Sequence, residues 1–556
     1  MSTAGWLSRL TLLQALILAL LVKLVIAALL PMTGDEAYFV LWGRHLDYGY
    51  YDHPPMTGWM TWLMLQLSEH PVVVRLPGIV TELLIALGLY AQWHRFDAEK
   101  ARLAALLFLF SPLSLIFVFT LTDTGCMLFA AASSFAAMQA LRHASPAITT
   151  GHSAKSYGWA VLAGLSLGLA FLSKYFAVFL GLAYLIYFFG VNHRLWRLGI
   201  TLVLVAIPFG LLNLYWNLTH CWSNLLFNLV NRNRGEVGIQ WSDVLTYIGM
   251  MSYVVLPPLA LAWWRSWGYL QKPHLQKQSP PAELAEAARL ARVIVLTALV
   301  GFLVISLKKT IGLHWVLWFY PMVLLALFST PVLQWQRWLR WMGWLSAAHV
   351  TVILVILLMP LGAWQHKPKI AKDLLAATEA PALLLAVQAQ LITDAGLTPA
   401  QAASLPLAAQ GYTWASVLSY QLKQPVMVIG PGSKYARQDD FWTDFRALDG
   451  RTILVYLKRP SELATISAWF AQTRLLPVSY RGQTYAFAFA EGFSYERYLT
   501  QVLTPVRDNY YAVPDWLPGG SCPVTQRYFS ATGPRAPAGF EAATSVDAVA
   551  GTAASP

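Results

Sequence analysis

The stretch that decides the fold is LTLLQALILALLVKLVIAALL, from Leu10 to Leu30, followed at once by the polar sequence Pro31-Met32-Thr33-Gly34-Asp35-Glu36. The apolar run has the ~20 residues that a helix needs to cross a bilayer. No small-residue cleavage site follows it, so we expect a retained helix and not a removed signal peptide. Carboxylates are costly to place at the end of such a helix, which makes Asp35 and Glu36 candidates for a functional site.

The composition is that of an integral membrane protein. The chain has 556 residues, of which 57% are hydrophobic and 12% are charged, whereas soluble domains carry roughly 25% charged residues. The formal net charge of +12 does not indicate a nucleic-acid partner, because the basic residues lie between apolar runs instead of forming one stripe. The length allows a large helical membrane domain and one further domain.

Apolar segments recur along residues 1–364, and we count about eleven that are long enough to span a membrane. They lie at about 10–30, 72–92, 101–120, 124–141, 158–173, 175–191, 197–215, 244–264, 292–307, 314–332 and 342–361. Residues 36–68 are amphipathic, rich in Trp and broken by two prolines, which predicts two short interfacial helices in the first outer loop. The predicted fold class is therefore an all-α polytopic membrane domain.

The Lys/Arg content of the loops predicts the orientation, because short cytoplasmic loops are rich in basic residues. One alternating set of loops is the richer one: Arg95, Lys100, Arg102, Arg142, Lys155, Arg194, Arg197, Arg265, Lys272, Lys277, Arg289, Arg292, Arg337 and Arg340. We place that set and the N-terminus in the cytoplasm. The loop with Asp35, and everything after residue 361, then lies on the opposite side of the membrane.

Residues 365–530 have a different pattern. Helical segments at 374–391, 414–421 and 462–471 alternate with β-rich runs at 425–429, 452–457 and 484–489. This alternation predicts a small α/β domain outside the membrane. Residues 531–556 are rich in Ala, Gly, Pro, Ser and Thr, which is typical of a disordered tail.

Several groups of polar residues fall on the outer side in this topology. They are Asp35-Glu36, Asp52-His53, Arg75, Asp123, Lys174, and Lys308-Lys309 with His314. Each has an ordinary alternative role: Asp35 can cap a helix, Asp52 and His53 can stabilise a turn, His314 can be an interfacial histidine, and the cations can extend to lipid headgroups. Asp123 is different, because the very short polar gap around it places it at bilayer depth. Since all these signals fall on one face, we expect a shared site.

The motifs that carry these residues form a family pattern. They are the acidic pair after the first helix, Tyr50-Tyr51-Asp52-His53-Pro54-Pro55, Arg75-Leu76-Pro77, Thr122-Asp123-Thr124, Leu172-Ser173-Lys174-Tyr175 and His314-Trp315. Over residues 10–330 the chain resembles the family-39-type, dolichyl-phosphate-mannose-protein mannosyltransferase-like membrane glycosyltransferases of the GT-C superfamily. Within that group it is most similar to bacterial transferases that move aminoarabinose or other sugars from undecaprenyl phosphate to lipid A.

The resemblance implies an inverting glycosyltransferase of the bacterial inner membrane, with a polyprenyl-phosphate-linked sugar donor and a periplasmic acceptor that is a lipid, a glycan or a protein. It implies catalytic roles for Asp35, Glu36 and Asp123, with Asp35 as the general base or as the residue that orients the acceptor. Outer cations would bind the donor phosphate: Arg75, Lys174, Lys308, Lys309 and, as further candidates, Arg232 or Arg234. Asp52, His53 and His314 would contact substrate. Members of the family differ in their need for a divalent cation, so no cofactor follows from the resemblance.

The chemistry fits these residue types. Transfer from a sugar phosphate passes through an oxocarbenium-like transition state, which nearby carboxylates stabilise. Fixed cations stabilise the charge that grows on the departing phosphate. The main alternative is a transporter or lipid flippase, which usually shows internal repeats and charges near the midplane. The second alternative is a non-catalytic scaffold that acts through its outer domain, which would leave the acids without a role.

Overall fold

The computed structural model describes residues 6–144, 153–233, 238–255, 263, 282–328, 334–430 and 437–530. The predicted disordered tail, 531–556, lies outside these residues. The chain divides into two compact units. One comprises Met1–Pro381 with Ser416–Gln424, and the other comprises Ala382–Ala415 with Pro425–Pro556.

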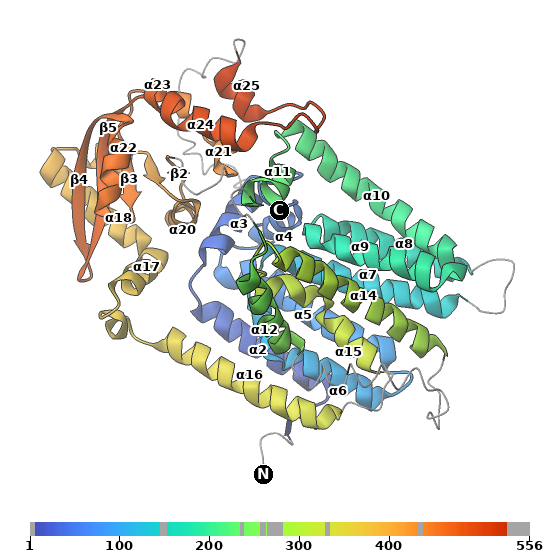
Figure 1. Cartoon of the computed structure of the whole chain (residues 1–556). Coiled ribbons are helices and arrows are strands. Elements are labelled where there is room, and N and C mark those ends of the chain that lie inside the picture. Colours follow the sequence, from blue (N-terminus) through green and yellow to red (C-terminus); the bar gives the residue numbers. More distant parts are fainter. Residues whose placement is uncertain are drawn as a thin grey trace, which may run out of the picture. The chain divides into compact units, whose positions relative to one another are not determined.

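The first unit is a bundle of apolar helices that run side by side (Figure 1). Its longer helices are α2 (Leu12–Leu29), α5 (Pro71–Trp93), α6 (Ala98–Leu109), α7 (Thr122–His143), α8 (Ala154–Phe171), α10 (Trp196–Thr219), α12 (Trp241–Val255), α14 (Ala282–Ser306) and α16 (Trp335–Leu358). The short helices α3 (Gly34–Arg44) and α4 (Met56–Leu65) match the two predicted for the first loop. The chain is thus a polytopic helical membrane protein, as predicted.

Among the residues that the structure describes, fewer full-length spans are found than the eleven predicted, and the predicted span at 244–264 lies partly outside those residues. By length and composition, six of the described helices can cross a membrane, or up to eight if each of two bent pairs counts as one span. The run at 101–120 is bent by 63° between α6 and the 3-10 helix η1 (Pro112–Val118), because Pro112 cannot continue the α-helical hydrogen bonding. The runs at 175–191 and 314–332 form shorter helices, Tyr175–Val191 and Leu313–Phe328.

Helix α7 lies at the centre of the first unit. Of its most apolar 18-residue window, 72% is buried, against 22% for α10 and 11% for α16. Small residues such as Ala130, Ala137 and Ser133 let neighbouring helices approach α7 closely. The structure therefore places Asp123, in the first turn of α7, at the end of the most buried of the six candidate spans.

The second unit contains a five-stranded sheet with the order β2-β1-β3-β5-β4. Its strands are β1 (Leu407–Ala409), β2 (Val426–Val428), β3 (Ile453–Leu457), β4 (Phe470–Tyr480) and β5 (Gln483–Phe493). Strand β1 pairs in parallel with β2 and β3, whereas β5 pairs antiparallel with β3 and β4. Every residue of β3 is buried, which fits its unbroken apolar sequence ILVYL. A small mixed α/β unit was predicted here, and the structure contains one.

Candidate functional site

Asp123 and Lys174 form a buried ion pair at the end of the helical bundle. The ammonium Nζ of Lys174 lies 2.8 Å from Oδ1 and 2.7 Å from Oδ2 of Asp123. Asp123 is in the first turn of α7, where the positive end of the helix dipole favours a carboxylate. Lys174 follows α8 in the tight turn before Tyr175. Burying a charge pair costs desolvation free energy. This pair lies at the N-terminal end of the central helix α7.

Aromatic rings and a second cation surround the Lys174 ammonium. Its Nζ lies 5.5 Å from the ring centroids of both Phe176 and Trp315. The guanidinium of Arg232 lies 5.8 Å from the same Trp315 ring and 5.2 Å from that of Phe227. Two cations from different segments therefore flank one indole, a contact worth roughly 0.5–2 kcal/mol for each cation. Of the two further arginine candidates, Arg232 belongs to the site, and Arg234 lies outside the described residues.

His314 connects the two predicted acids. Its Nε2 lies 3.8 Å from Oδ2 of Asp123, and its imidazole also interacts electrostatically with Asp35 and with Lys174. Asp35 is exposed in the first turn of α3. The N-cap of α3 is Thr33, whose hydroxyl accepts from the backbone N–H of Glu36. Asp35 is therefore not the capping residue of this helix, and it is an exposed acid within electrostatic range of His314.

His53 lies in the same cluster. Burial lowers the pKa of its imidazole well below the ordinary value of 6.5, and the nearby charges of Lys174, Arg232 and His314 lower it further. The His53 ring is therefore neutral at physiological pH, when it can both donate and accept a hydrogen bond. Asp52 precedes it, and its backbone carbonyl accepts a 3.1 Å bond from Nδ2 of Asn228.

Three asparagines hold the turn that carries His53. Side-chain amides of Asn224 and Asn231 reach the backbone carbonyl of Tyr50 at 2.7 Å and the hydroxyl of Tyr51 at 3.4 Å, alongside the Asn228 bond. They come from helix α11 (Ser223–Leu229) and the residues just after it. The sequence analysis missed these positioning residues. Their spacing of four and three residues, which places them on one helical face, was the available signal.

Gly125 marks where three segments of the site meet. A Cβ atom at this position would lie 2.5 Å from Oγ of Ser173 and 2.9 Å from Cγ of Met56. The backbone N–H of Met56 also donates a 3.0 Å bond to the carbonyl of Leu172. The first turn of α7, the Ser173-Lys174 turn and the start of α4 are therefore in direct contact.

Glu36 and Arg75 form a second buried ion pair, with a different character. Nε and Nη2 of Arg75 each donate a 2.8 Å bond to the carboxylate of Glu36, and both side chains are fully buried. The remaining N–H groups of Arg75 donate to the carbonyls of Ala27, Leu30 and Pro31, at 2.7–2.9 Å. All five guanidinium donors are thus used. This geometry does not support donor-phosphate binding by Arg75 or catalysis by Glu36.

The structure gives less support to Lys308 and Lys309 as site residues. Lys308 is exposed, and its Nζ donates a 2.8 Å bond to the backbone carbonyl of Gly238. Lys309 follows it and is partly buried. Phosphate binding by these two residues stays a prediction. Among the described residues, no group of three or more His, Cys, Asp or Glu side chains is placed to hold a metal ion.

Comparison with solved structures identifies the fold. A crystal structure of ArnT from Cupriavidus metallidurans in the apo state matches with a TM-score of 0.56 and 16% sequence identity, over 88% of this chain and 98% of that one. The structure of ArnT bound to undecaprenyl phosphate matches over the same shares with a TM-score of 0.55. At this identity the match shows a shared fold. The chain therefore has the fold of GT-C membrane glycosyltransferases.

Sequence comparison finds a family match over part of the chain. Residues 52–216 match the dolichyl-phosphate-mannose-protein mannosyltransferase family, and they include Asp52, His53, Arg75, Asp123 and Lys174. The lipid A galacturonosyltransferase RgtD from Rhizobium johnstonii is 29% identical over 234 residues, which are 41% of this chain and 47% of that relative. The chain thus aligns with about half the length of this curated relative. The family resemblance predicted from the sequence is confirmed.

Proposed function

We propose that this protein is an inverting glycosyltransferase that moves a sugar from a polyprenyl-phosphate donor to an acceptor outside the cytoplasm. The observation that carries the proposal is the convergence on His314 and Trp315. Two acids from separate helices, Asp35 and Asp123, interact with His314, while two cations, Lys174 and Arg232, flank the Trp315 ring. Acids for an oxocarbenium-like centre and cations for a phosphate are thus present side by side.

The reaction needs one displacement at the anomeric carbon of the sugar. An oxygen of the acceptor forms a bond to that carbon while the bond from carbon to the phosphate oxygen breaks. The electron pair leaves with the polyprenyl phosphate, and a base takes up the acceptor proton. A single displacement inverts the configuration at the anomeric carbon. A positioned base contributes typically ~10²–10⁴-fold to such a step.

We assign the base role to Asp35, because it is the exposed acid of the site and can reach an incoming hydroxyl or phosphate. Lys174 and Arg232 are assigned to the donor phosphate. Asp123 has both oxygens on Lys174, so its role is to hold that ammonium in place and to interact with His314. His53, neutral and enclosed, is assigned a substrate hydrogen bond. Glu36 and Arg75 are assigned to the scaffold.

The relatives suggest the substrates. The ArnT complex contains undecaprenyl phosphate, and the curated relative is named a lipid A galacturonosyltransferase. We therefore propose undecaprenyl phosphate as the carrier and lipid A as the acceptor. The proposed location is the bacterial inner membrane, with the N-terminus in the cytoplasm and the C-terminal unit in the periplasm.

The test compares membranes from cells that carry the wild-type gene, an Asp35→Asn variant, or no gene. Mass spectrometry of lipid A should show an added mass of one sugar with the wild type. That mass should be lost with Asp35→Asn, because the amide cannot accept the acceptor proton. A Glu99→Gln variant, which changes an exposed acid at the opposite end of the bundle, should keep the added mass.

Two outcomes would contradict the proposal. Full sugar transfer by a folded Asp35→Asn protein would show that Asp35 is not the base. Movement of a labelled lipid across proteoliposomes without any covalent transfer would instead support the flippase alternative. If the added sugar appears on another envelope glycan or on a protein, the acceptor assignment changes while the transferase assignment stands.

A further inference from the structure

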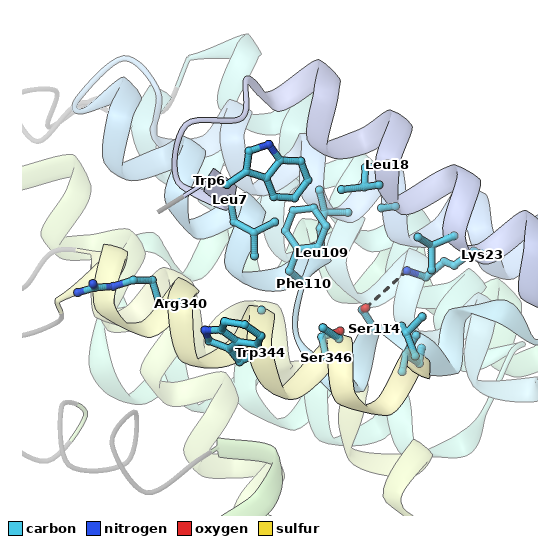
Figure 2. A pocket seen from close by; sticks show the side chains of 16 residues that line it. Trp6, Leu7, Leu18, Lys23, Leu109, Phe110, Ser114, Arg340, Trp344 and Ser346 are labelled. Carbon is cyan, nitrogen blue, oxygen red and sulfur yellow. Dashed lines mark hydrogen bonds between the residues drawn. The ribbon is translucent and has the colours of Figure 1, made fainter. Parts of the chain in front are cut away.

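A lateral groove in the first unit lies away from the candidate site. It has a volume of about 360 Å³ and is bounded by α2, by the end of α6 with η1, and by α16. Figure 2 shows Arg340 at one end, and Lys23, joined to Ser114 by a dashed line, at the other. Its wall is almost entirely apolar, with Leu109 and Phe110 as its inner lining. The volume is near the lower end of the ~300–1,000 Å³ range of ligand sites.

The groove has the length of one membrane leaflet. Its lining on α16 runs from Arg340 to Val350, and ten helical residues rise about 15 Å. That is half of the ~30 Å hydrocarbon thickness of a bilayer. Only 11% of the apolar window of α16 is buried, so most of this helix, which forms one side of the groove, is available to lipid. The small residues Gly343 and Ala347 leave space on the α16 side of the groove.

One end of the groove is built for an anionic headgroup. Arg337 and Arg340 lie in the first turns of α16, are exposed, and form no ion pair with any residue that the structure describes. Trp344 and Trp6 are also exposed at this end. Unpaired cations next to interfacial tryptophans are typical of a contact with anionic lipid.

The other end is closed by charges. Nζ of Lys23 lies 2.7 Å from Oε2 of Glu82 on α5 and 3.5 Å from Oγ of Ser114. Lys23 and Glu82 are buried within the bundle. A hydrocarbon chain that extended past this point would have to displace a buried ion pair, which is costly. The ion pair therefore limits the length of the groove at this end.

We propose that this groove binds one acyl chain of an anionic glycerophospholipid, whose phosphate pairs with Arg340. The volume and the closed end fit one leaflet-length chain and exclude the much longer polyprenyl chain of a carrier lipid. The bound chain would fill the gap between α2 and α16. Since α2 leads directly into the loop with Asp35, the lipid would also fix the first helix of the catalytic unit.

Native mass spectrometry of the purified full-length protein tests this proposal. The protein is released from detergent that contains equal amounts of phosphatidylglycerol and phosphatidylcholine with the same acyl chains. The wild type should retain one phosphatidylglycerol, preferred about fivefold over phosphatidylcholine, because phosphatidylglycerol has a net negative charge near Arg340 whereas the choline group neutralises the phosphate of phosphatidylcholine. Arg340→Gln should bring that ratio to about one while a lipid is still retained.

Ala347→Trp should abolish retention, because the indole fills the groove. Ala348→Trp is the matched control: it is the next residue, it is also exposed, and it does not line the groove, so retention should be unchanged. If Ala347→Trp melts well below the control, Val350→Phe replaces it at the other end of the groove.

The proposal fails if lipid retention is the same in Ala347→Trp and in the wild type. It also fails if Arg340→Gln keeps the full preference for phosphatidylglycerol. Undecaprenyl phosphate, supplied in a separate run, should be retained equally by Ala347→Trp and Ala348→Trp. Its selective loss from Ala347→Trp would show that the groove binds the carrier lipid and would overturn the assignment.

Discussion

Two buried ion pairs of the first unit, Glu36–Arg75 and Asp123–Lys174, look alike in the sequence but differ in the structure. In the first pair the guanidinium uses all five donors on protein oxygens, three of them backbone carbonyls. In the second pair the ammonium uses two donors on Asp123 and otherwise faces the rings of Phe176 and Trp315.

The difference teaches how to separate structural from functional charges in a membrane bundle. Arg75 ties the end of α2 to the start of α3, and it has no donor left for a ligand. Lys174 keeps bonding capacity, and a second cation, two imidazoles and an exposed acid lie around it. Both pairs are buried, with side-chain exposures of 0% and 0% against 7% and 4%, so the remaining hydrogen-bonding capacity is what distinguishes them.

The strongest test of this comparison is Arg75→Met. It leaves the Glu36 carboxylate buried without its partner, which costs about 3–5 kcal/mol in the free energy of unfolding. Thermal melting and denaturant unfolding in detergent measure the loss. The double variant Arg75→Met/Glu36→Met should recover most of the stability together with transferase activity. If the Arg75→Met protein is stable but binds the sugar donor more weakly, Arg75 is a ligand of the donor phosphate after all.

Lys174→Met is the corresponding change in the second pair. We expect sugar transfer to fall about 10²–10³-fold, the usual effect of removing one preorganised electrostatic group. The double variant Lys174→Met/Asp123→Met should regain stability without regaining transfer, which separates this pair from the first. Rates are measured on purified protein with saturating acceptor. Equal recovery of transfer activity by both double variants would mean that the two ion pairs have the same role.

The pH dependence of stability tests the surroundings of the second pair, Asp123–Lys174. Below pH 6.5 the unfolded chain protonates His53, whereas the folded protein does not, because burial and then Lys174 depress its pKa. Folded-state stability should therefore fall as the pH drops below about 6.5, by up to about 1.4 kcal/mol per pH unit for this group. Melting between pH 7.5 and 5.0 should be less acid-sensitive in His53→Asn. The exposed His366→Gln is the control and should keep the wild-type slope.

The smallest effect is expected for a third ion pair in the same unit, Arg44–Glu69. Nη2 of Arg44 lies 2.9 Å from Oε1 of Glu69, but the two side chains are 25% and 36% exposed. Exposed pairs contribute about 0–1 kcal/mol, so Arg44→Gln should barely change the melting temperature. A loss as large as that of Arg75→Met would show that burial is not the variable that ranks these pairs.

Much of the fold could be predicted from the sequence. The apolar runs, the two short helices before residue 68 and the mixed α/β unit all follow from hydrophobic periodicity. The number of full-length spans could not, because apolar composition does not show where Pro112 bends a helix. Strand β4 was also missed, and the helix predicted at 462–471 ends at Ser467 in the structure. The alternation of polar and apolar residues in β4 predicts a strand only weakly, and the helical pattern just before it is stronger.

The site could be predicted in part. Asp35, His53, Asp123, Lys174 and His314 were selected as outer charges, and the structure gathers them. The sequence could not show that Arg75 is saturated, since its partners are backbone carbonyls of a distant helix. The roles of Asn224, Asn228 and Asn231 could not be predicted in the same way, because their amides are uncharged and their partners are distant backbone carbonyls and a hydroxyl. Lys23 and Glu82 were missed too, although a single charge within an apolar run is a recognisable signal.

Gly125 has a consequence for how this protein can vary. The residue touches no substrate and carries no chemistry, yet even a methyl group there would collide with Ser173 and Met56. Such a collision would push Asp123, two positions earlier, away from its lysine. Laboratory evolution for altered activity should therefore leave this codon untouched. Position 125 therefore accepts only glycine, because a residue with a Cβ atom does not fit between Ser173 and Met56.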